Sequence, residues 1–249
     1  MSLSDHLYKI RYRAFVNCIG GDRADIEYRF NLSEKHQYLY VETPKVACTT
    51  IKAVLQGAEG RKVDQVGADA IHNRGQSPLH SPKNNPKLFF RILNSESAYR
   101  FTFVRNPYTR LLSAYLDKIR QKPIFDEWRV RRLQQLSLPI NENISFHDFV
   151  KSLENADPQK MDAHWRPQVL LIAQTNVHYN FIGRFENLNE DIKNVARYLG
   201  FSDSLDFIKN PHVTNSDQKI KKYYNKELFK MVNEIFLDDF KELNYDIIK

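Results

Sequence analysis

The chain contains few cysteines and no long apolar run. Only Cys18 and Cys48 occur among its 249 residues, which is too few for a disulfide-stapled scaffold or a cysteine-rich zinc site. No apolar stretch approaches the ~18 residues that a membrane-spanning helix needs. Charged side chains interrupt residues 1–15, where a signal peptide would have its apolar region. We therefore expect a soluble chain without a membrane span.

The sequence also lacks internal repeats, low-complexity tracts and long blocks of like charge. Its 37 Lys and Arg residues outnumber its 30 Asp and Glu residues, so the net charge is +7. This excess predicts an anionic partner, and a polyphosphate, a sulfated sugar and a nucleic acid all fit it. With 42% hydrophobic residues, the chain can bury one sizeable core, so we expect a single domain over residues 1–249.

Alternating strand and helix patterns predict an α/β fold. The expected strands cover residues 38–42, 101–104 and 181–185, and the expected helices cover about 49–56, a stretch from Pro107, 145–153, 188–199 and a stretch from about Asn225. This alternation predicts a largely parallel sheet with helices on both faces. We expect the core to span about 38–245, with 1–37 as an N-terminal extension and with 72–87 and 121–143 as long loops.

The loop after the first expected strand has the composition of a phosphate site. Open α/β sheets bind ligands beyond the carboxyl ends of their strands, and here that loop consists of Pro44, Lys45, Val46, Ala47, Cys48, Thr49 and Thr50. Its hydroxyls, its lysine and the N–H groups of the following helix suit a phosphate. The loop is not a Walker A loop, because it has no glycine and Lys45 stands at its start. The alternative is an ordinary turn whose threonines cap the helix.

The second expected strand leads to another pair of candidate anion ligands. Arg105 stands at the end of that strand, and Ser113 lies on the second turn of the helix that follows. A guanidinium group offers a planar fork to a phosphate, and the serine adds a hydroxyl. Two anion sites on neighbouring loops predict a ligand with two separated phosphate groups.

Several segments resemble one family in the same order along the chain. TPKVACTTIK (43–52) and FTFVRNPYTRLLSAYLDK (101–118) resemble the 5′-phosphosulfate and 3′-phosphate sites of carbohydrate sulfotransferases of the chondroitin, dermatan and HNK-1 type and their bacterial relatives. HWRPQ (164–168), YNFIGRFENLNED (179–191) and FLDDFKELNY (236–245) resemble later blocks of the family. The resemblance implies a P-loop-like α/β sulfotransferase fold.

The resemblance also implies a donor, an acceptor and residue roles. The donor would be 3′-phosphoadenosine 5′-phosphosulfate (PAPS), the product 3′-phosphoadenosine 5′-phosphate (PAP), and the acceptor a carbohydrate, with no metal and no nucleic acid. Lys45 would stabilise charge on the departing phosphate, and the other residues of 44–50 would hold the 5′-phosphate. Arg105 and Ser113 would bind the 3′-phosphate, and Lys219 would reach it from a segment that relatives fold over the nucleotide.

Three histidines are candidates for the base that takes the acceptor's proton. Relatives place a histidine between the two phosphate-binding blocks, where His72 and His80 both lie. We favour His72, because residues 68–71 resemble the family's lead-in. His164 is the third candidate, and it or Arg166 could instead contact an acidic acceptor sugar. For each histidine the alternative is a surface or packing role.

Compartment and function class have alternatives. Secreted relatives carry a closely spaced cysteine pair where this chain has Ile172 and Thr175, so we expect a cytoplasmic enzyme, with a Golgi-lumen domain of a truncated, membrane-anchored enzyme as the alternative. One competing function is a nucleotide-dependent kinase or phosphotransferase, which the missing glycines and magnesium-binding strand end disfavour. The other is a non-catalytic polyanion-binding module, which only the net charge supports.

Overall fold

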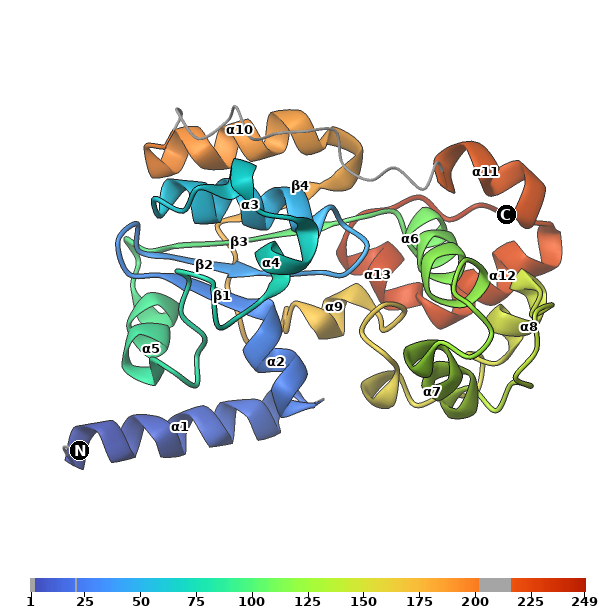
Figure 1. Ribbon diagram of the computed structural model, residues 1–249, viewed down its shortest axis with the longest axis horizontal. Coiled ribbons are helices and arrows are strands. Elements are labelled where there is room, and N and C mark those ends of the chain that lie inside the picture. The colour runs from blue at the N-terminus through green and yellow to red at the C-terminus, as the bar shows by residue number, and fades with distance from the viewer. Residues whose placement is uncertain (1–2, 21, 202–215) are drawn as a thin grey trace. The chain divides into compact units, whose positions relative to one another are not determined.

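The chain forms two compact units. The structure is a computed structural model and describes residues 3–20, 22–201 and 216–249. Unit 1 combines residues 1–104 with 172–211, and unit 2 combines 105–171 with 212–249. Figure 1 draws the elements of both units.

Unit 1 is built on a four-stranded sheet. In spatial order its strands are β1 (Phe30–Ser33), β2 (Tyr38–Val41), β3 (Tyr99–Val104) and β4 (Phe181–Arg184). β1 pairs with β2 antiparallel, whereas β2, β3 and β4 are parallel to one another. The expected α/β class and the mainly parallel sheet are thus confirmed. β1 was not expected, and it places the start of the sheet upstream of residue 38.

Helices cover both faces of this sheet. The helices of unit 1 are α1 (Leu3–Ile19), α2 (Arg23–Arg29), α3 (Cys48–Ala58), α4 (Ala68–His72), α5 (Pro86–Asn94) and α10 (Leu188–Leu199), with short 3₁₀ turns at η1 (Val63–Gln65) and η4 (Phe185–Asn187). Figure 1 shows α3 and α10 on one side of the sheet and α5 on the other, with α1 beside α5.

The alternation of side chains along β2 explains the two layers. Tyr38 and Tyr40 belong to the cluster that α3 and α10 complete, whereas Leu39 and Val41 belong to the cluster that α1 and α5 complete. Successive side chains of a strand point to opposite faces, so a strand that is apolar throughout is buried between two helical layers. The predicted end of α10 is also confirmed, because Gly200 follows it with a left-handed φ of 73°.

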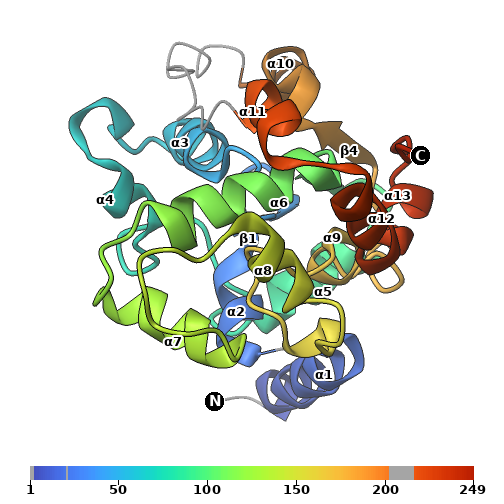
Figure 2. The same ribbon diagram turned by 90° about the vertical axis from the view of Figure 1, so that its right-hand side faces the viewer.

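The described part of unit 2 consists of helices joined by turns and loops, without a strand. Its elements are α6 (Pro107–Tyr115), the π-helical turn η2 (Leu116–Arg120), α7 (Glu127–Gln135), α8 (Phe146–Lys151), η3 (Pro158–Lys160), α9 (Gln168–Leu171), α11 (Ser216–Tyr223), α12 (Lys226–Ile235) and α13 (Leu237–Glu242). α6 contacts α8, α11 and α12 (Figure 2). Its Tyr115 packs on Phe149 of α8, and Phe149 packs edge-on against Trp165, so aromatic side chains form much of this core.

Local signals placed several of these helices, and one expectation was wrong. The Asn106, Ser145 and Asn225 side chains each accept a backbone N–H at the start of α6, α8 and α12, as the sequence predicts. The expected loop over 121–143 instead contains α7. That helix is strongly polar and buries only Arg129 and Leu133, so it lacks the apolar stripe by which a helix is recognised in a sequence.

No helix in the described part of the chain is both long enough and apolar enough to cross a bilayer.

Candidate functional site

The loop of residues 44–50 joins β2 to α3 and carries backbone strain. Lys45 and Ala47 both adopt left-handed conformations, with φ of 71° and 53°. Such a conformation costs a residue with a Cβ about 1–3 kcal/mol, and strain of this kind gathers at ligand-binding segments. Because glycine usually occupies these positions and the loop has none, nothing in the sequence pointed to this conformation.

The loop also prepares the start of α3 for an anion. Ala47 is the N-cap of α3 and provides no capping side chain. The first N–H groups of a helix lack partners within the helix, and its dipole places partial positive charge there. Left-handed residues in such a loop are typical of the concave backbone nests that bind phosphates. The backbone of 44–50 therefore suits a phosphate group.

The side chains of the loop divide into anchors and exposed groups. Val46, Cys48 and Thr50 are buried, and the Cys48 thiol donates to the Thr43 carbonyl at 2.9 Å. Burial, followed by the negative charge of Glu42, holds the pKa of this thiol far above its ordinary value. Cys48 is therefore a neutral anchor of the loop. Thr49, in contrast, is exposed at the first turn of α3.

A buried ion pair lies behind the loop. Glu42, the residue after β2, pairs with Lys52 of α3, and their side chains are only 4% and 1% exposed. The Lys52 ammonium also lies 4.1 Å from the centroid of the Tyr28 ring. Two charges this deeply buried depend on each other, so the pair ties α3 to the end of β2. Sequence reasoning missed it, because only the fold brings Glu42 and Lys52 together.

The structure brings His72 to the loop. His72 ends α4, and its Nε2 lies 2.9 Å from Thr49 Oγ1. Its Nδ1 lies 2.7 Å from the hydroxyl oxygen of Tyr28 on α2. The Gln56 side chain of α3 donates to the Ile71 carbonyl at 2.8 Å and so fixes α4 against α3. The side chain of His72 thus contacts the 44–50 loop at Thr49.

His80 has a different local role. Its backbone forms an isolated antiparallel bridge with Leu32 of β1, with N–H···O bonds of 3.0 and 2.9 Å. The bridge extends the hydrogen bonding of the sheet edge into the 72–87 segment. As an alternative base, His80 stays a prediction.

His164 belongs to unit 2, where its imidazole contacts the carboxylate of Asp162. Its Nδ1 lies 2.6 Å from Asp162 Oδ1, and Arg132 Nε donates to Asp162 Oδ2 at 2.9 Å. Burial lowers the pKa of His164 below its ordinary value, although the bond and the charge of Asp162 oppose this. Burial alone would raise the pKa of Asp162, but His164 and Arg132 outweigh it and hold that pKa well below the usual range. Burial thus favours the neutral form of the His164 imidazole, whose Nδ1 faces the Asp162 carboxylate.

Arg105 and Ser113, also in unit 2, are 4% and 1% exposed. Arg105 directly follows β3, and its Nε donates to Thr109 Oγ1 at 3.0 Å. Gln168 bonds to the Arg105 backbone on both sides, and buried Asp239 in turn accepts from Gln168. Gln168 and Asp239 are functional candidates that the sequence reasoning missed. The only signal for them was their place in two segments of family resemblance.

Arg166 and Lys219, two further residues of the predicted site, belong to unit 2. Arg166 is 6% exposed, and its Nε and Nη2 donate to the Met161 carbonyl at 3.0 and 2.8 Å. Contact of Arg166 with an acceptor sugar stays a prediction. Lys219 lies half-buried on α11, and most of the segment before it, residues 202–215, lies outside the described residues.

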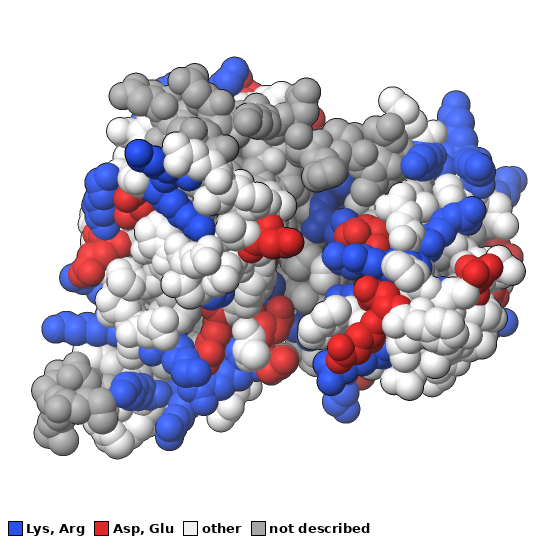
Figure 3. Space-filling view, viewed as in Figure 1, with Lys and Arg blue, Asp and Glu red and all other residues white. Residues whose placement is uncertain are grey.

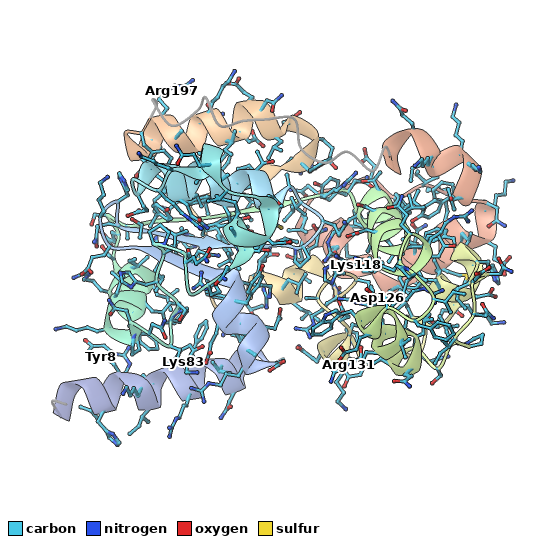
Figure 4. All side chains as sticks on the ribbon, in the orientation of Figure 1. Tyr8, Lys83, Lys118, Asp126, Arg131 and Arg197 are labelled. Atoms are coloured by element: carbon cyan, nitrogen blue, oxygen red, sulfur yellow. The ribbon has the colours of Figure 1, made fainter. Side chains whose placement is uncertain are left out.

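Basic side chains do not form one patch on the face that Figure 3 shows. Lys and Arg are spread over both units with Asp and Glu among them. Of the three arginines of α7, Arg129 is buried, Arg132 pairs with Asp162, and Arg131 points outward near the exposed Trp128 ring (Figure 4). Within the described ranges, no group of three or more His, Cys, Asp or Glu side chains could hold a metal ion.

Comparisons with known proteins agree on one family. The profile of the sulfotransferase family matches residues 28–246. Carbohydrate sulfotransferase 14 of Homo sapiens is 28% identical over 186 residues, which cover 72% of this chain and 48% of that protein. Carbohydrate sulfotransferase 10 of Xenopus laevis is 26% identical over 241 residues, or 87% of this chain and 67% of that protein.

The match to the first of these relatives is partial in length, since this chain spans about half of it. Carbohydrate sulfotransferase 11 of Rattus norvegicus is 27% identical over 242 residues, which cover 87% of this chain and 66% of that protein. No solved structure gives a significant match. Because the family profile covers β1 to α13, including the 44–50 loop, Arg105 and Gln168, the chain belongs to the sulfotransferase family.

Proposed function

We propose that this protein transfers the sulfuryl group of PAPS to a hydroxyl group of a carbohydrate. Membership of the sulfotransferase family supports the donor, and the names of the relatives support the acceptor class. The observation that carries the proposal is the 44–50 loop, in which Lys45 and Ala47 are left-handed at a helix start without a capping side chain. We extend the proposal to the fold, in which β2, this loop and α3 take a P-loop-like arrangement.

The residues of the loop fit the phosphosulfate end of the donor. That end is a compact anion, and the loop offers the Lys45 ammonium, the Thr49 and Thr50 hydroxyls and the first N–H groups of α3. N–H groups at a helix start and a lysine are common partners of phosphate oxygens. Arg105 and Ser113 would bind the 3′-phosphate, the second anion of the same donor.

Sulfuryl transfer requires a group that stabilises negative charge on the leaving phosphate and a base that accepts a proton. The donor supplies an activated sulfur with a phosphate as leaving group, and sulfuryl transfer is an in-line displacement at that sulfur. Lys45 would stabilise the negative charge that grows on the departing phosphate. His72 would accept the proton of the acceptor hydroxyl, and a neutral imidazole is a competent base near pH 7. Both residues belong to unit 1.

Calorimetric titration with PAP tests the donor assignment. We expect metal-independent binding that Lys45→Ala and Arg105→Ala each weaken by about tenfold or more, since each removes a charged hydrogen-bond donor. Lys193→Ala, an exposed lysine of α10, is the matched control and should bind like the wild type. ADP without metal, which lacks the 3′-phosphate, should bind more weakly than PAP.

Two results would contradict the proposal. Preference for ATP with magnesium over PAP would favour a kinase. Absence of binding by any nucleotide would leave a module that binds polyanions, whose affinity would fall steeply as the salt concentration rises. If PAP binds as expected, transfer of radioactive sulfate from PAPS to a panel of oligosaccharides identifies the acceptor.

A further inference from the structure

Three side chains in contact, those of Tyr28, His72 and Thr49, connect α2 to the 44–50 loop. Tyr28 of α2 contacts His72 Nδ1 at 2.7 Å, and Thr49 of α3 contacts His72 Nε2 at 2.9 Å. Both nitrogens of the imidazole therefore face a hydroxyl group. A hydroxyl can donate or accept, whereas a neutral imidazole has one donor and one acceptor nitrogen. The hydrogen bonds between Tyr28, His72 and Thr49 can therefore run in two directions.

The two arrangements differ in which nitrogen can act as a base. In the first, Tyr28 donates to Nδ1 and Nε2–H donates to Thr49, so the nitrogen beside the loop already holds a proton. In the second, Nδ1–H donates to the Tyr28 oxygen and Thr49 donates to Nε2. Only the second leaves the lone pair of Nε2 on the side of the loop.

We propose that Tyr28 is a positioning residue whose oxygen accepts the Nδ1–H of His72 and thereby keeps the Nε2 lone pair directed toward the 44–50 loop. This inference rests on the proposed function, in which His72 is the base. In many proteins a carboxylate or a backbone carbonyl accepts one N–H of a histidine and so fixes its tautomer. Here the phenol oxygen of Tyr28 would be that acceptor. Thr49 then covers Nε2 until an acceptor hydroxyl replaces it.

The surroundings hold Tyr28 in place for this task. Its ring lies nearly parallel to the His72 ring, with an interplanar angle of 18° and centroids 6.4 Å apart. The Lys52 ammonium lies 4.1 Å from the centroid of the Tyr28 ring, and an ion pair with Glu42 holds Lys52 in place. Burial, and then the charge of Glu42, keep the pKa of Tyr28 far above its ordinary value. The phenol therefore stays neutral across the working pH range.

The segment that carries His72 is fixed as well. Gln56 Nε2 donates to the Ile71 carbonyl at 2.8 Å, and Arg61 Nη1 donates to the Ala70 carbonyl at 3.1 Å. After His72, the Arg74 guanidinium donates to Asn31 Oδ1 at 2.6 Å. The backbone is thus held on both sides of His72, and the hydroxyls of Tyr28 and Thr49 contact its two ring nitrogens, where the tautomer is decided.

The reaction step balances with these residues alone. As the acceptor oxygen forms its bond to sulfur, the bond from sulfur to the departing phosphate oxygen breaks, and that oxygen keeps the electron pair. The proton of the acceptor hydroxyl goes to His72 Nε2. The resulting imidazolium retains its Nδ1–H···O bond to Tyr28, which helps to stabilise the new positive charge.

Nitrogen-15 NMR of the imidazole tests the tautomer directly, without any need for activity. In the wild type, at a pH where the ring is neutral, we expect the proton of His72 on Nδ1. Tyr28→Phe keeps the ring and its contact with Lys52 but removes the oxygen, and we expect a shift of the proton toward Nε2. Tyr198→Phe is the matched control, because Tyr198 is an exposed residue that stacks on Tyr99 through its ring alone.

Kinetics supply the second readout. Loss of one hydrogen bond to the base predicts a fall in kcat of about tenfold in Tyr28→Phe, while the affinity for PAP and the KM for the donor stay within about twofold. A neutral His72 protonated on Nε2 in the wild type would overturn the inference. So would a Tyr28→Phe variant with wild-type kcat, or a His72→Ala variant that keeps wild-type turnover. Failure of the wild type to bind PAP is a separate result, which refutes the proposed function and leaves the tautomer measurement valid.

Discussion

Gln168 holds the backbone of Arg105 on both sides. Its Oε1 accepts the Arg105 N–H at 2.9 Å, and its Nε2 donates to the Arg105 carbonyl at 2.8 Å. Asp239 fixes Gln168 in turn, because its carboxylate accepts the backbone N–H groups of Gln168 and Val169, each at 2.9 Å. Gln168 and Asp239 are fully buried. A residue near the C-terminus therefore sets the position of Arg105 through one amide side chain.

This relationship predicts the effect of Gln168→Leu. Leucine has a similar volume but leaves the N–H and carbonyl groups of Arg105 without their partner, so the arginine should lose its position. We expect the affinity for PAP to fall by about tenfold, while the affinity for adenosine 5′-phosphosulfate, which has no 3′-phosphate, stays unchanged. Calorimetric titration with both ligands measures the ratio.

The ratio also separates positioning from general damage to the fold. Equal losses for the two ligands would mean that Gln168 supports the fold rather than the 3′-phosphate site. Gln135→Leu, at an exposed position of α7, is the matched control and should change neither affinity.

Lys45→Ala should slow transfer strongly and leave the fold intact. The ammonium is proposed to stabilise charge that develops on the leaving phosphate, and removal of such a group costs about 10²–10³-fold in kcat. Because Lys45 is partly exposed, the melting temperature should change little. Initial rates of transfer from PAPS and a thermal unfolding scan measure the two effects. A variant that keeps more than a tenth of the wild-type kcat would refute this role.

The sequence predicted the parts of the fold that local patterns specify. β2 is an apolar run between Gln37 and Glu42, β3 and β4 each contain short apolar stretches, and α10 has a clear apolar stripe that ends at Gly200. β1 was missed because two of its four residues are polar and it follows α2 without an intervening turn signal. α7 was missed because its buried face includes an arginine, Arg129, whose guanidinium donates to backbone carbonyls.

The site was predicted in composition but not in conformation. The residue types of 44–50 indicated a phosphate, and the resemblance singled out His72, whose side chain contacts Thr49 of this loop. The left-handed backbone at Lys45 and Ala47 could not be predicted, because the loop has no glycine to indicate it. The contact of His72 with Tyr28 joins residues 44 positions apart, and such contacts are set by tertiary packing rather than by spacing along the chain.

The Glu42–Lys52 pair predicts a large loss of stability in Lys52→Met. The substitution keeps an unbranched side chain but leaves the buried Glu42 carboxylate without its counter-charge. Removal of one partner of a buried pair costs about 3–5 kcal/mol of the free energy of unfolding, which guanidinium denaturation measures. The double variant Glu42→Gln with Lys52→Met should recover part of this loss.

An exposed pair provides the comparison. Arg23 and Glu27 of α2 form an ion pair in which the arginine side chain is 47% exposed, and such pairs contribute about 0–1 kcal/mol. If Lys52→Met costs no more than Arg23→Met, the buried pair does not hold α3 to the end of β2.

The Asp162–His164 pair predicts that stability falls in acid. The pKa of His164 is lowered in the folded state, so the unfolded chain takes up a proton first as the pH drops through about 6.5, the ordinary histidine value. Stability present above that pH is therefore lost below it. Asp162, whose pKa is also lowered, adds a second loss of the same sign as the pH falls through about 4. The imidazole is 24% exposed, so the histidine effect should be modest.

Melting temperatures between pH 8 and pH 5 test this sign. His164→Asn retains an N–H donor for Asp162 but does not titrate, so its melting temperature should fall less steeply than that of the wild type. A steeper fall in His164→Asn than in the wild type would contradict the sign of the pKa shift.

Backbone strain at Ala47 predicts opposite effects for two small substitutions. Ala47 has a φ of 53°, which glycine adopts freely and a β-branched residue adopts only at high cost. In Ala47→Gly, relief of this strain opposes the greater entropy of the unfolded chain, so the free energy of unfolding should change by less than about 1 kcal/mol. Ala47→Val should lose about 1–3 kcal/mol and should also weaken PAP binding, because the loop would have to leave its left-handed conformation. Urea denaturation and PAP titration of the two variants measure these effects, and a Val variant as stable and as tightly binding as the Gly variant would show that the left-handed conformation is not needed.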